Sequence, residues 1–215
     1  MEGHKTFIPA ASFDWLLPLY DPMTKLLGLD KARRILLSDA TLPPNSRVLE
    51  IGCGTGSFSI LIKRLHPDAY VVGLDPDAKA LARAQRKADQ AKVQIQLDQG
   101  FSDSLPHQKE TFDVVFSSMM FHHLDRDAKE KTLSEVHRVL KRGGLFAMLD
   151  LTKPESAIGS LLSRLFHSSD LLKDNSESQI LRLLNDAGLR DARIVRRGKF
   201  LIGNVSHYQA LNLGR

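Results

Sequence analysis

Short apolar runs alternate with amphipathic stretches along most of the chain. Runs of strand length lie at residues 47–51, 69–74, 93–97, 112–116, 145–149, 192–195 and 202–208. Apolar residues at helical spacing fall between them, at 58–65, 76–90, 127–141 and 177–187. Most of the runs are apolar on both faces, which is typical of strands in a parallel sheet covered on both sides. We therefore predict an α/β fold with a doubly wound, mainly parallel sheet.

Two further segments of helical tendency stand outside this alternation, at 11–37 and 155–167. The second is strongly amphipathic, with one apolar stripe made of Ile158, Leu161, Leu162, Leu165 and Phe166. We expect both to pack on the sheet, where extra helices of open α/β folds often cover the ligand crevice. Because no repeat or long linker interrupts the chain, residues 1–215 are expected to form a single domain.

The composition is that of an ordinary globular protein, with 42% hydrophobic and 26% charged residues among 215. No apolar stretch approaches the roughly 20 residues that span a bilayer, and the N-terminus lacks the pattern of a secretory signal. The one cysteine, Cys53, excludes an intrachain disulfide and a cysteine-based metal cluster. These features predict a cytoplasmic protein. The histidines show no metal-ligand spacing, so no metal site is expected.

The net charge is +5, with a sequence pI near 9.4. We interpret this first as a solubilising surface, although a basic balance also suits nucleic acid or an anionic membrane surface. The densest basic cluster lies at 190–199 and is expected on one face of a late strand.

Three glycines at alternate positions follow the first apolar run. Gly52, Gly54 and Gly56 separate a predicted strand from a predicted helix. Glycine lets the backbone turn tightly and lets a ligand approach without meeting a Cβ. The helix N-terminus adds unpaired N–H groups that suit a polar or anionic ligand. Packing alone also produces glycine-rich turns of this kind, so that alternative stays open.

An acid follows the second predicted strand at the distance expected for ribose binding. Asp75 lies 19 residues after Gly56 (75 − 56), and an acid about 20 residues past such a loop can hold a ribose hydroxyl pair. The alternative is that Asp75 caps a helix beginning at Pro76. A dinucleotide fingerprint requires a third glycine where Ser57 stands, which disfavours an NAD-linked oxidoreductase.

The G-x-G-x-G loop with the preceding Glu50 resembles motif I of class I S-adenosylmethionine-dependent methyltransferases. Four more blocks resemble the family's motifs in the family's order, at 73–76, 99–106, 112–124 and 136–145. The resemblance covers residues 47–150. It implies a seven-stranded sheet whose last strand is antiparallel. It also implies an N-terminal helical cap (1–40), a cofactor-binding half (41–150) and a lid helix, helix and strand hairpin (151–215).

The resemblance further implies S-adenosyl-L-methionine as the cofactor. Glu50 and the glycines would surround its methionyl end, and Asp75 would hold its ribose. The implied binding residues are Glu50, Gly52, Cys53, Gly54, Gly56, Asp75, Pro76, Gly100, Phe101 and Ser117. Phe101 departs from the family, because many relatives carry an acid there. The adenine would then meet backbone or Asp103, and the Phe101 ring either contacts the adenine or packs in the core.

Within the family, the sequence most resembles the small-molecule branch that includes ubiquinone/menaquinone biosynthesis C-methyltransferases. Candidate catalytic residues are His122 and His123, which follow the fourth strand, and Tyr20 of the N-terminal cap. Each also has a structural interpretation, such as capping or covering. Apolar residues near the expected crevice, from Trp15 to Phe166, hint at a small, aromatic or lipid-like acceptor. We expect a monomer or homodimer.

Two alternatives to this function remain open. An RNA or protein methyltransferase would use the basic surface, but residues 117–120 lack the Asn/Asp-Pro-Pro-aromatic motif of nucleic-acid amino-methylating relatives. Base C5-methylation needs a cysteine nucleophile, whereas Cys53 lies in the glycine loop. Nucleic acid is therefore disfavoured as a substrate, although RNA is not excluded. We also expect cytosolic behaviour rather than contact with a membrane surface. The second alternative is a protein that binds the cofactor without transferring its methyl group.

Overall fold

The computed structural model describes residues 28–152, 175–200 and 203–214. Its helices are α2 (Leu29–Asp39), α3 (Ser57–Leu65), α4 (Ala78–Ala91), α5 (Arg126–Val139), α7 (Glu177–Asp186) and the short 3₁₀ helix η2 (Phe121–His123). Its strands are β1 (Arg47–Ile51), β2 (Tyr70–Asp75), β3 (Gln96–Gln99), β4 (Phe112–Ser118), β5 (Leu140–Thr152), β6 (Arg190–Phe200) and β7 (Gly203–Leu211).

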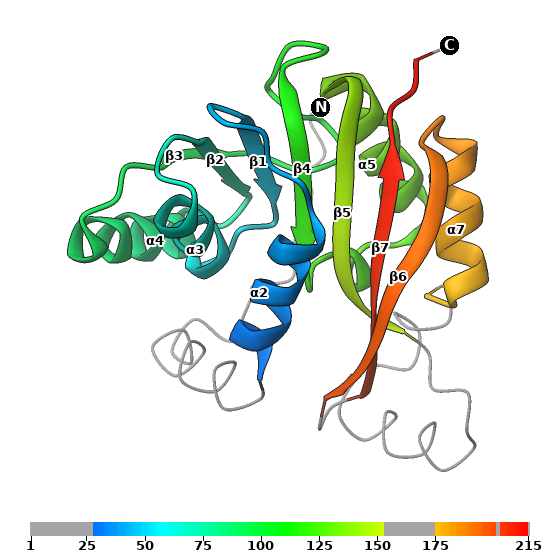
Figure 1. Ribbon diagram of the computed structural model, residues 1–215, viewed down its shortest axis with the longest axis horizontal. Helices are drawn as coiled ribbons and strands as arrows, with labels where there is room; N and C mark the ends of the chain where they lie inside the picture. The colour runs from blue at the N-terminus through cyan, green and yellow to red at the C-terminus, as the bar shows by residue number, and fades with distance from the viewer. Residues whose placement is uncertain (1–27, 153–174, 201–202, 215) are drawn as a thin grey trace, which may run out of the picture.

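The strands form a seven-stranded sheet in the order β3-β2-β1-β4-β5-β7-β6 (Figure 1). The pairs from β3 to β5 are parallel, whereas β7 runs antiparallel to both β5 and β6. This confirms the predicted doubly wound, mainly parallel sheet with an antiparallel last strand. The strand order reverses between β1 and β4, and ligands of open α/β sheets bind at such a switch point.

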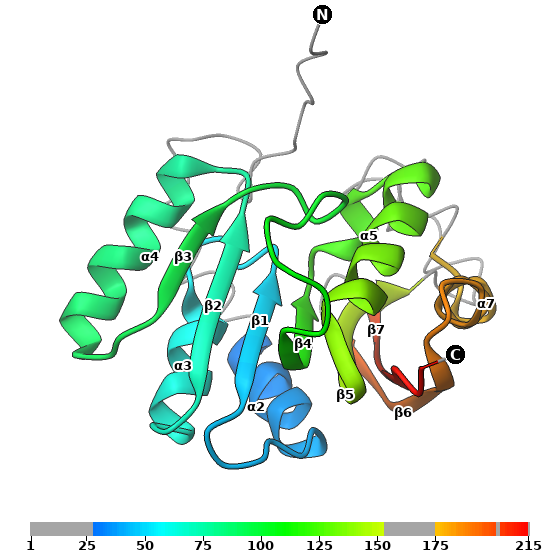
Figure 2. The same ribbon diagram turned by 90° about the horizontal axis from the view of Figure 1, so that it is seen from above.

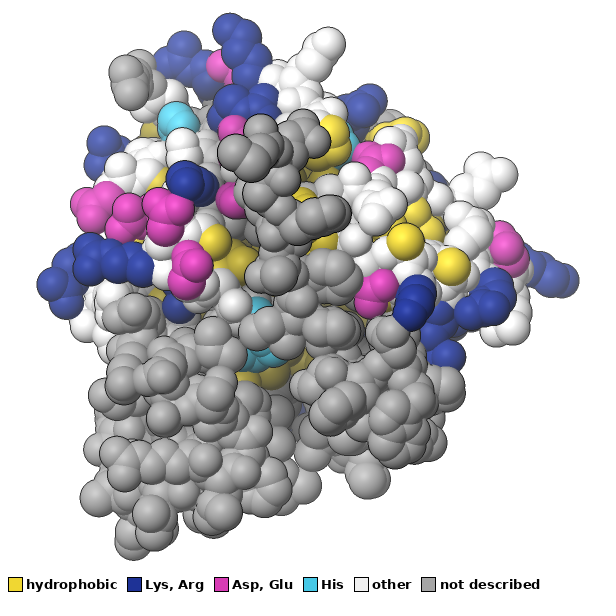
Figure 3. Space-filling model, turned by 180° about the vertical axis from the view of Figure 1, so that it is seen from behind, with side chains coloured by type: hydrophobic (Ala, Val, Ile, Leu, Met, Phe, Trp, Pro, Cys, Tyr) yellow, Lys and Arg dark blue, Asp and Glu magenta, His cyan; other side chains and the backbone are white. Residues whose placement is uncertain are grey.

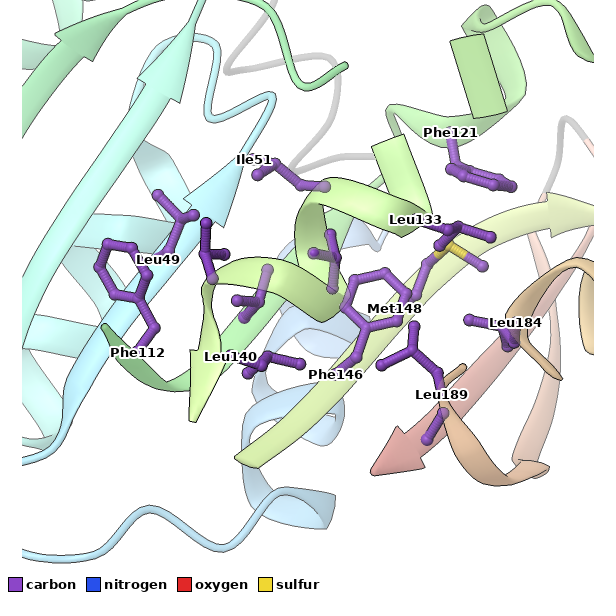
Figure 4. Packing of buried hydrophobic residues seen from close by; sticks show 14 of the residues in the cluster. Leu49, Ile51, Phe112, Phe121, Leu133, Leu140, Phe146, Met148, Leu184 and Leu189 are labelled. Carbon is purple, nitrogen blue, oxygen red and sulfur yellow. The ribbon is translucent and has the colours of Figure 1, made fainter. Parts of the chain in front are cut away.

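Helices cover both faces of the sheet (Figures 1 and 2). Helices α2 and α3 pack on one face against Val48, Val114 and Phe116, while α5 and α7 pack on the other. Successive residues of a strand point to opposite faces, so neighbours in sequence belong to different cores. The core under α5 and α7 runs from Phe112 through Phe146 to Phe121 and Leu189 (Figure 4).

Several element boundaries differ from the prediction, most of all in β5 and β6, which are Leu140–Thr152 and Arg190–Phe200 rather than 145–149 and 192–195. The third strand is Gln96–Gln99 rather than 93–97, because α4 extends to Ala91 and ends at Lys92 in the left-handed conformation. Helix α4 begins at Ala78 and not at Pro76. Its N-cap is Asp77, whose carboxylate accepts a hydrogen bond from Lys79 N at 2.8 Å.

The basic cluster of β6 does not lie on one face, which corrects that expectation. The Arg196 guanidinium pairs with Asp39 at the end of α2, 3.1 Å away. Arg197 pairs with Glu177 in the first turn of α7, 2.8 Å away. This second pair lies on the face of the sheet opposite to that of the Arg196 pair. Alternation along the strand sends adjacent arginines to opposite faces, and each meets an acid there.

Part of the sequence prediction lies outside the described residues. It comprises most of the predicted helix at 11–37, including Tyr20, and the whole predicted lid helix at 155–167. No described helix is long and apolar enough to cross a membrane. On the face shown in Figure 3, basic and acidic side chains are interspersed among the coloured residues.

Candidate functional site

The glycine bend joins β1 to α3 at the carboxyl edge of the sheet. Gly52, Gly54 and Gly56 all have positive φ, between 52° and 71°, a region that glycine enters without steric cost. A Cβ on Gly56 would lie 2.7 Å from Ala84 Cβ, and one on Gly52 would collide with the side chain of Met120. Packing therefore requires two of the three glycines, in addition to any need for ligand access.

Asp75, at the tip of β2, is bonded to the glycine bend. One carboxylate oxygen accepts from Gly54 N at 2.8 Å and the other from Asp77 N at 3.0 Å. Burial raises the pKa of Asp75, and the two N–H donors oppose that rise. Asp77 caps α4, so the alternative that Asp75 caps a helix beginning at Pro76 is wrong.

Glu50 lies fully buried one strand away from Asp75. Its Oε2 accepts a hydrogen bond from the Ser59 hydroxyl of α3. Its Oε1 has no hydrogen-bond partner among the described residues. Burial raises the pKa of Glu50 from 4.5 to about 7, and the positive charge of Arg33 opposes the rise. A buried carboxylate oxygen without a hydrogen-bond partner, beside the bend, is suited to a positively charged ligand group.

Ser117 and Cys53, two other predicted binding residues, differ in the surroundings of their side chains. Ser117, at the end of β4, is fully buried and its hydroxyl has no partner in the described part of the chain. Cys53 turns its thiol toward Gly73 of β2, where an added Cβ would lie 2.9 Å from Sγ. Burial raises the pKa of that thiol well above its ordinary value. The Cys53 thiol is therefore directed into the sheet, and the Cys53 N–H is donated to Leu74 O at 3.0 Å.

The predicted adenine loop lies next to the tip of β2. Gly100 N donates to Asp75 O at 3.2 Å, and the Gln99 side chain donates to Pro76 O at 3.1 Å. The Phe101 side chain is half-buried. Helix α5 holds the far end of the loop, because Glu135 accepts from Leu105 N at 2.7 Å. The structure thus brings Gly100, Phe101 and Pro76 to the same edge as Asp75.

His122 forms a buried pair with a carboxylate that the sequence prediction missed. His122 Nδ1 lies 2.6 Å from Asp150 Oδ1, and His122 N donates to Asp150 Oδ2 at 3.3 Å. Asp150 is fully buried on β5 and also accepts from Leu151 N at 2.7 Å. The His123 ring lies 4.0 Å from that of His122, centroid to centroid.

Asp150 and Arg33 are the site residues that sequence reasoning missed. Asp150 directly follows an apolar run, as Asp75 does. The pattern that indicated Asp75, an acid at the end of a predicted strand, could therefore have indicated Asp150 as well. Arg33 is 5% exposed on α2 and donates to Ser118 Oγ at 3.1 Å. A basic residue within an amphipathic helix gives no sign in sequence that it is buried.

A separate cavity of about 870 Å³ lies beyond the end of β5. Its lining residues are Thr152, Ser176, Glu177, Ser178, Arg197, Gly198, Lys199, Asn204, Val205 and Ser206. Trp15 and Phe166, expected to line an apolar crevice, lie outside the described residues. Among the residues that are described, no group of three His, Cys, Asp or Glu side chains is placed to hold a metal ion.

Comparison with known proteins identifies relatives of the chain. Residues 48–144 match a family described as "Methyltransferase domain". An uncharacterised methyltransferase from Synechocystis sp. is 32% identical over 146 residues, which cover 67% of this chain and 66% of that protein. A demethylmenaquinone methyltransferase from Thermus thermophilus is 31% identical over 157 residues, covering 72% of this chain and 70% of that protein. The match to the Synechocystis relative spans slightly less than two thirds of its length.

Solved structures support the same fold. The crystal structure of an S-adenosylmethionine-dependent methyltransferase from Aquifex aeolicus superposes with a TM-score of 0.71 at 21% identity, covering 93% of this chain and 98% of that one. The sheet of seven strands and its antiparallel last strand are those that the resemblance to this family implied. The chain belongs to the class I S-adenosylmethionine-dependent methyltransferases, in the branch that contains the demethylmenaquinone methyltransferases.

Proposed function

We propose that this protein transfers a methyl group from S-adenosyl-L-methionine to a small acceptor. The observation that carries the proposal is the bond between Asp75 and Gly54 N, which joins the predicted ribose-binding acid to the glycine bend at 2.8 Å. Family membership supports the same reaction class. S-adenosylmethionine, when bound, supplies an electrophilic methyl group on a sulfonium together with its own leaving group.

The residues at the bend fit that cofactor. Glu50 Oε1 is a buried acceptor without a partner among the described side chains, which suits the ammonium of a methionyl group. Asp75 accepts one N–H on each oxygen, and a carboxylate has about four acceptor sites, so two remain for ribose hydroxyls. We assign the methionyl end to Glu50 and the bend, the ribose to Asp75, and the adenine to the Gly100–Phe101 region.

His122 is proposed as the base that accepts a proton from the acceptor. We propose the tautomer in which Nδ1–H is donated to Asp150 and Nε2 is the ring nitrogen that takes the proton. Asp150 then fixes the ring and stabilises the imidazolium that forms, as carboxylates do for other catalytic histidines. The remaining contribution of the chain is orientation, since in-line transfer needs the acceptor atom about 3 Å from the methyl carbon.

The acceptor is proposed to be small and aromatic or lipid-like. This proposal is supported by the Thermus relative, which is named a demethylmenaquinone methyltransferase. Demethylmenaquinone is a quinone, that is, a small aromatic-type ring with a lipid tail. The cavity next to Thr152 is a candidate site for part of such a molecule, because Thr152 and Asp150 lie on the same face of β5. The cytoplasmic location and the monomeric or dimeric state stay predictions.

Calorimetric titration tests cofactor binding first. S-adenosylmethionine and S-adenosylhomocysteine are expected to bind and NAD is not, and the reverse result would overturn the proposal. Incubation with methyl-labelled cofactor and a panel of quinols, phenols and lipids then tests transfer. Binding without any labelled product would favour the alternative of a protein that holds the cofactor without transferring methyl.

His122→Ala tests the base. Turnover is expected to fall by a factor of roughly 10² or more, with cofactor affinity within threefold of the wild type. The measurement is initial rate and cofactor titration on the same preparation. Unaltered turnover would assign His122 to a structural role.

A further inference from the structure

The segment between β4 and η2 passes directly over the glycine bend. Met119 occupies the left-handed region with φ 61°, which residues with a side chain rarely adopt. Its N–H donates to Leu149 O of β5 at 2.8 Å, so this hydrogen bond continues the pairing of β4 with β5 by one residue. Strained backbone of this kind persists where the surrounding structure holds it, and it gathers at functional sites.

This turn brings Met120 onto the bare backbone of Gly52. A Cβ on Gly52 would lie 2.7 Å from Met120 Cβ and closer still to its Cγ. The Met120 side chain therefore occupies the side of Gly52 on which any other residue would carry its own side chain. The sequence interpretation of Gly52 as room for a ligand is thus incomplete, because Met120 uses that room.

The same segment is anchored at its other end. Phe121 is fully buried and packs in the core with Leu133 (Figure 4). His122 is bound to Asp150 through both its ring nitrogen and its backbone N–H. From Met119 to His122 the chain is therefore held by the Leu149 carbonyl, by the contact of Met120 with Gly52, by the packing of Phe121 and by Asp150.

We propose that Met120 is a positioning residue for methyl transfer. By its contact with Gly52 it holds η2, and so His122, in register with the glycine bend. This inference rests on the proposed function, since it needs the cofactor at the bend and a base at His122. An unbranched thioether side chain suits the role, because it fills an irregular gap against backbone without a fixed shape of its own.

The test uses S-adenosylhomocysteine as the probe and the His122 Cε1–H signal in NMR as the readout, assigned with His122→Asn. In the wild type, saturation is expected to shift this signal. In Met120→Ala the shift should fall to less than a third while the dissociation constant of the probe stays within threefold. Met120→Leu, of similar volume, should restore the shift.

Met148→Ala is the matched control. Met148 is fully buried in the core under α5, whereas Met120 is half-buried, so this variant loses at least as much buried methionine side chain. It should lower thermal stability but keep the wild-type shift of His122. A normal shift in Met120→Ala, with normal probe binding, would overturn the inference alone. Failure of the wild type to bind the probe would overturn the proposed function and the inference together.

Discussion

At the level of single residues, the site is built from buried carboxylates with different partners. Asp75 accepts backbone N–H groups, Glu50 is bonded to Ser59 with one oxygen open, and Asp150 holds His122. Burial penalises the charged form of Glu50 and Asp75. The hydrogen bonds that each of the three carboxylates already accepts decide what it can still accept. Substitution of one carboxylate at a time therefore gives distinguishable results.

Asp75→Ala is expected to weaken S-adenosylmethionine binding at least tenfold, about 1.4 kcal/mol. It removes the proposed ribose acceptor and frees Gly54 N from its partner. Asp77→Ala is the control, because it removes the cap of α4, worth about 1 kcal/mol of stability, but keeps the carboxylate of Asp75. Calorimetric titration of both variants decides the matter. Equal affinities in Asp75→Ala and wild type would remove Asp75 from the ribose role.

Glu50 makes the ligand-free protein sensitive to pH. Burial raises its folded-state pKa to about 7, against 4.5 in the unfolded chain, with Arg33 and Asp75 as the neighbouring charges. Between these values the folded state binds more protons, so stability falls as pH rises from about 4.5 through 7. The shift corresponds to about 3 kcal/mol.

Glu50→Gln should remove this part of the pH dependence, as seen in urea unfolding at pH 5 and pH 8. Glu130→Gln, an exposed acid on α5, should keep the wild-type difference between the two pH values. A Glu50→Gln protein whose stability still fell with pH as steeply as the wild type would contradict the assignment.

At the level of elements, the bend depends on how closely α3 and α4 approach. Gly56 is the N-cap of α3, and its Cα faces Ala84 of α4. The same glycine thus gives the bend its left-handed turn and lets the two helices meet. Its place in the sequence motif therefore has a packing cause as well as a ligand-binding one.

Gly56→Ala is expected to destabilise the fold by about 2–4 kcal/mol. The left-handed conformation accounts for roughly 1–2 kcal/mol of this and the 2.7 Å approach to Ala84 Cβ for the remainder. Gly143→Ala isolates the first part, since Gly143 has φ 79° and open space around it. Urea denaturation of both variants measures the difference. Equal losses would mean that the contact with α4 adds nothing.

At the level of the whole molecule, the basic charge is distributed and partly paired. Arg196 and Arg197 are bound to acids on opposite faces of the sheet, and Figure 3 shows both signs interspersed. Nucleic-acid binding requires basic side chains gathered on one surface. The net charge of +5 therefore overstates the positive electrostatic potential that the phosphates of a nucleic acid would meet at this surface.

We expect only weak retention on RNA, lost by about 0.2 M salt. Elution of the full chain from an immobilised single-stranded RNA over a salt gradient measures it. Arg190→Ala serves as a control for a general charge effect and should elute only slightly earlier than the wild type. Retention well beyond that salt concentration would favour the RNA methyltransferase alternative.

Sequence patterns alone were enough to predict the order of elements, the parallel sheet, the glycine bend and the acid after β2. These depend on local periodicity and short spacing, which a chain carries wherever it folds. The boundaries of β3 and α4 were wrong by one to three residues, because capping by Asp77 and the left-handed Lys92 decide them.

Four features are visible only in the folded chain: the pairing of His122 with Asp150, the burial of Arg33, the contact of Met120 with Gly52 and the division of the β6 arginines between two faces. Each joins residues far apart in sequence that the register of the sheet and the packing of its helices bring together. Such contacts leave no periodic mark in the chain, since they depend on which strands become neighbours.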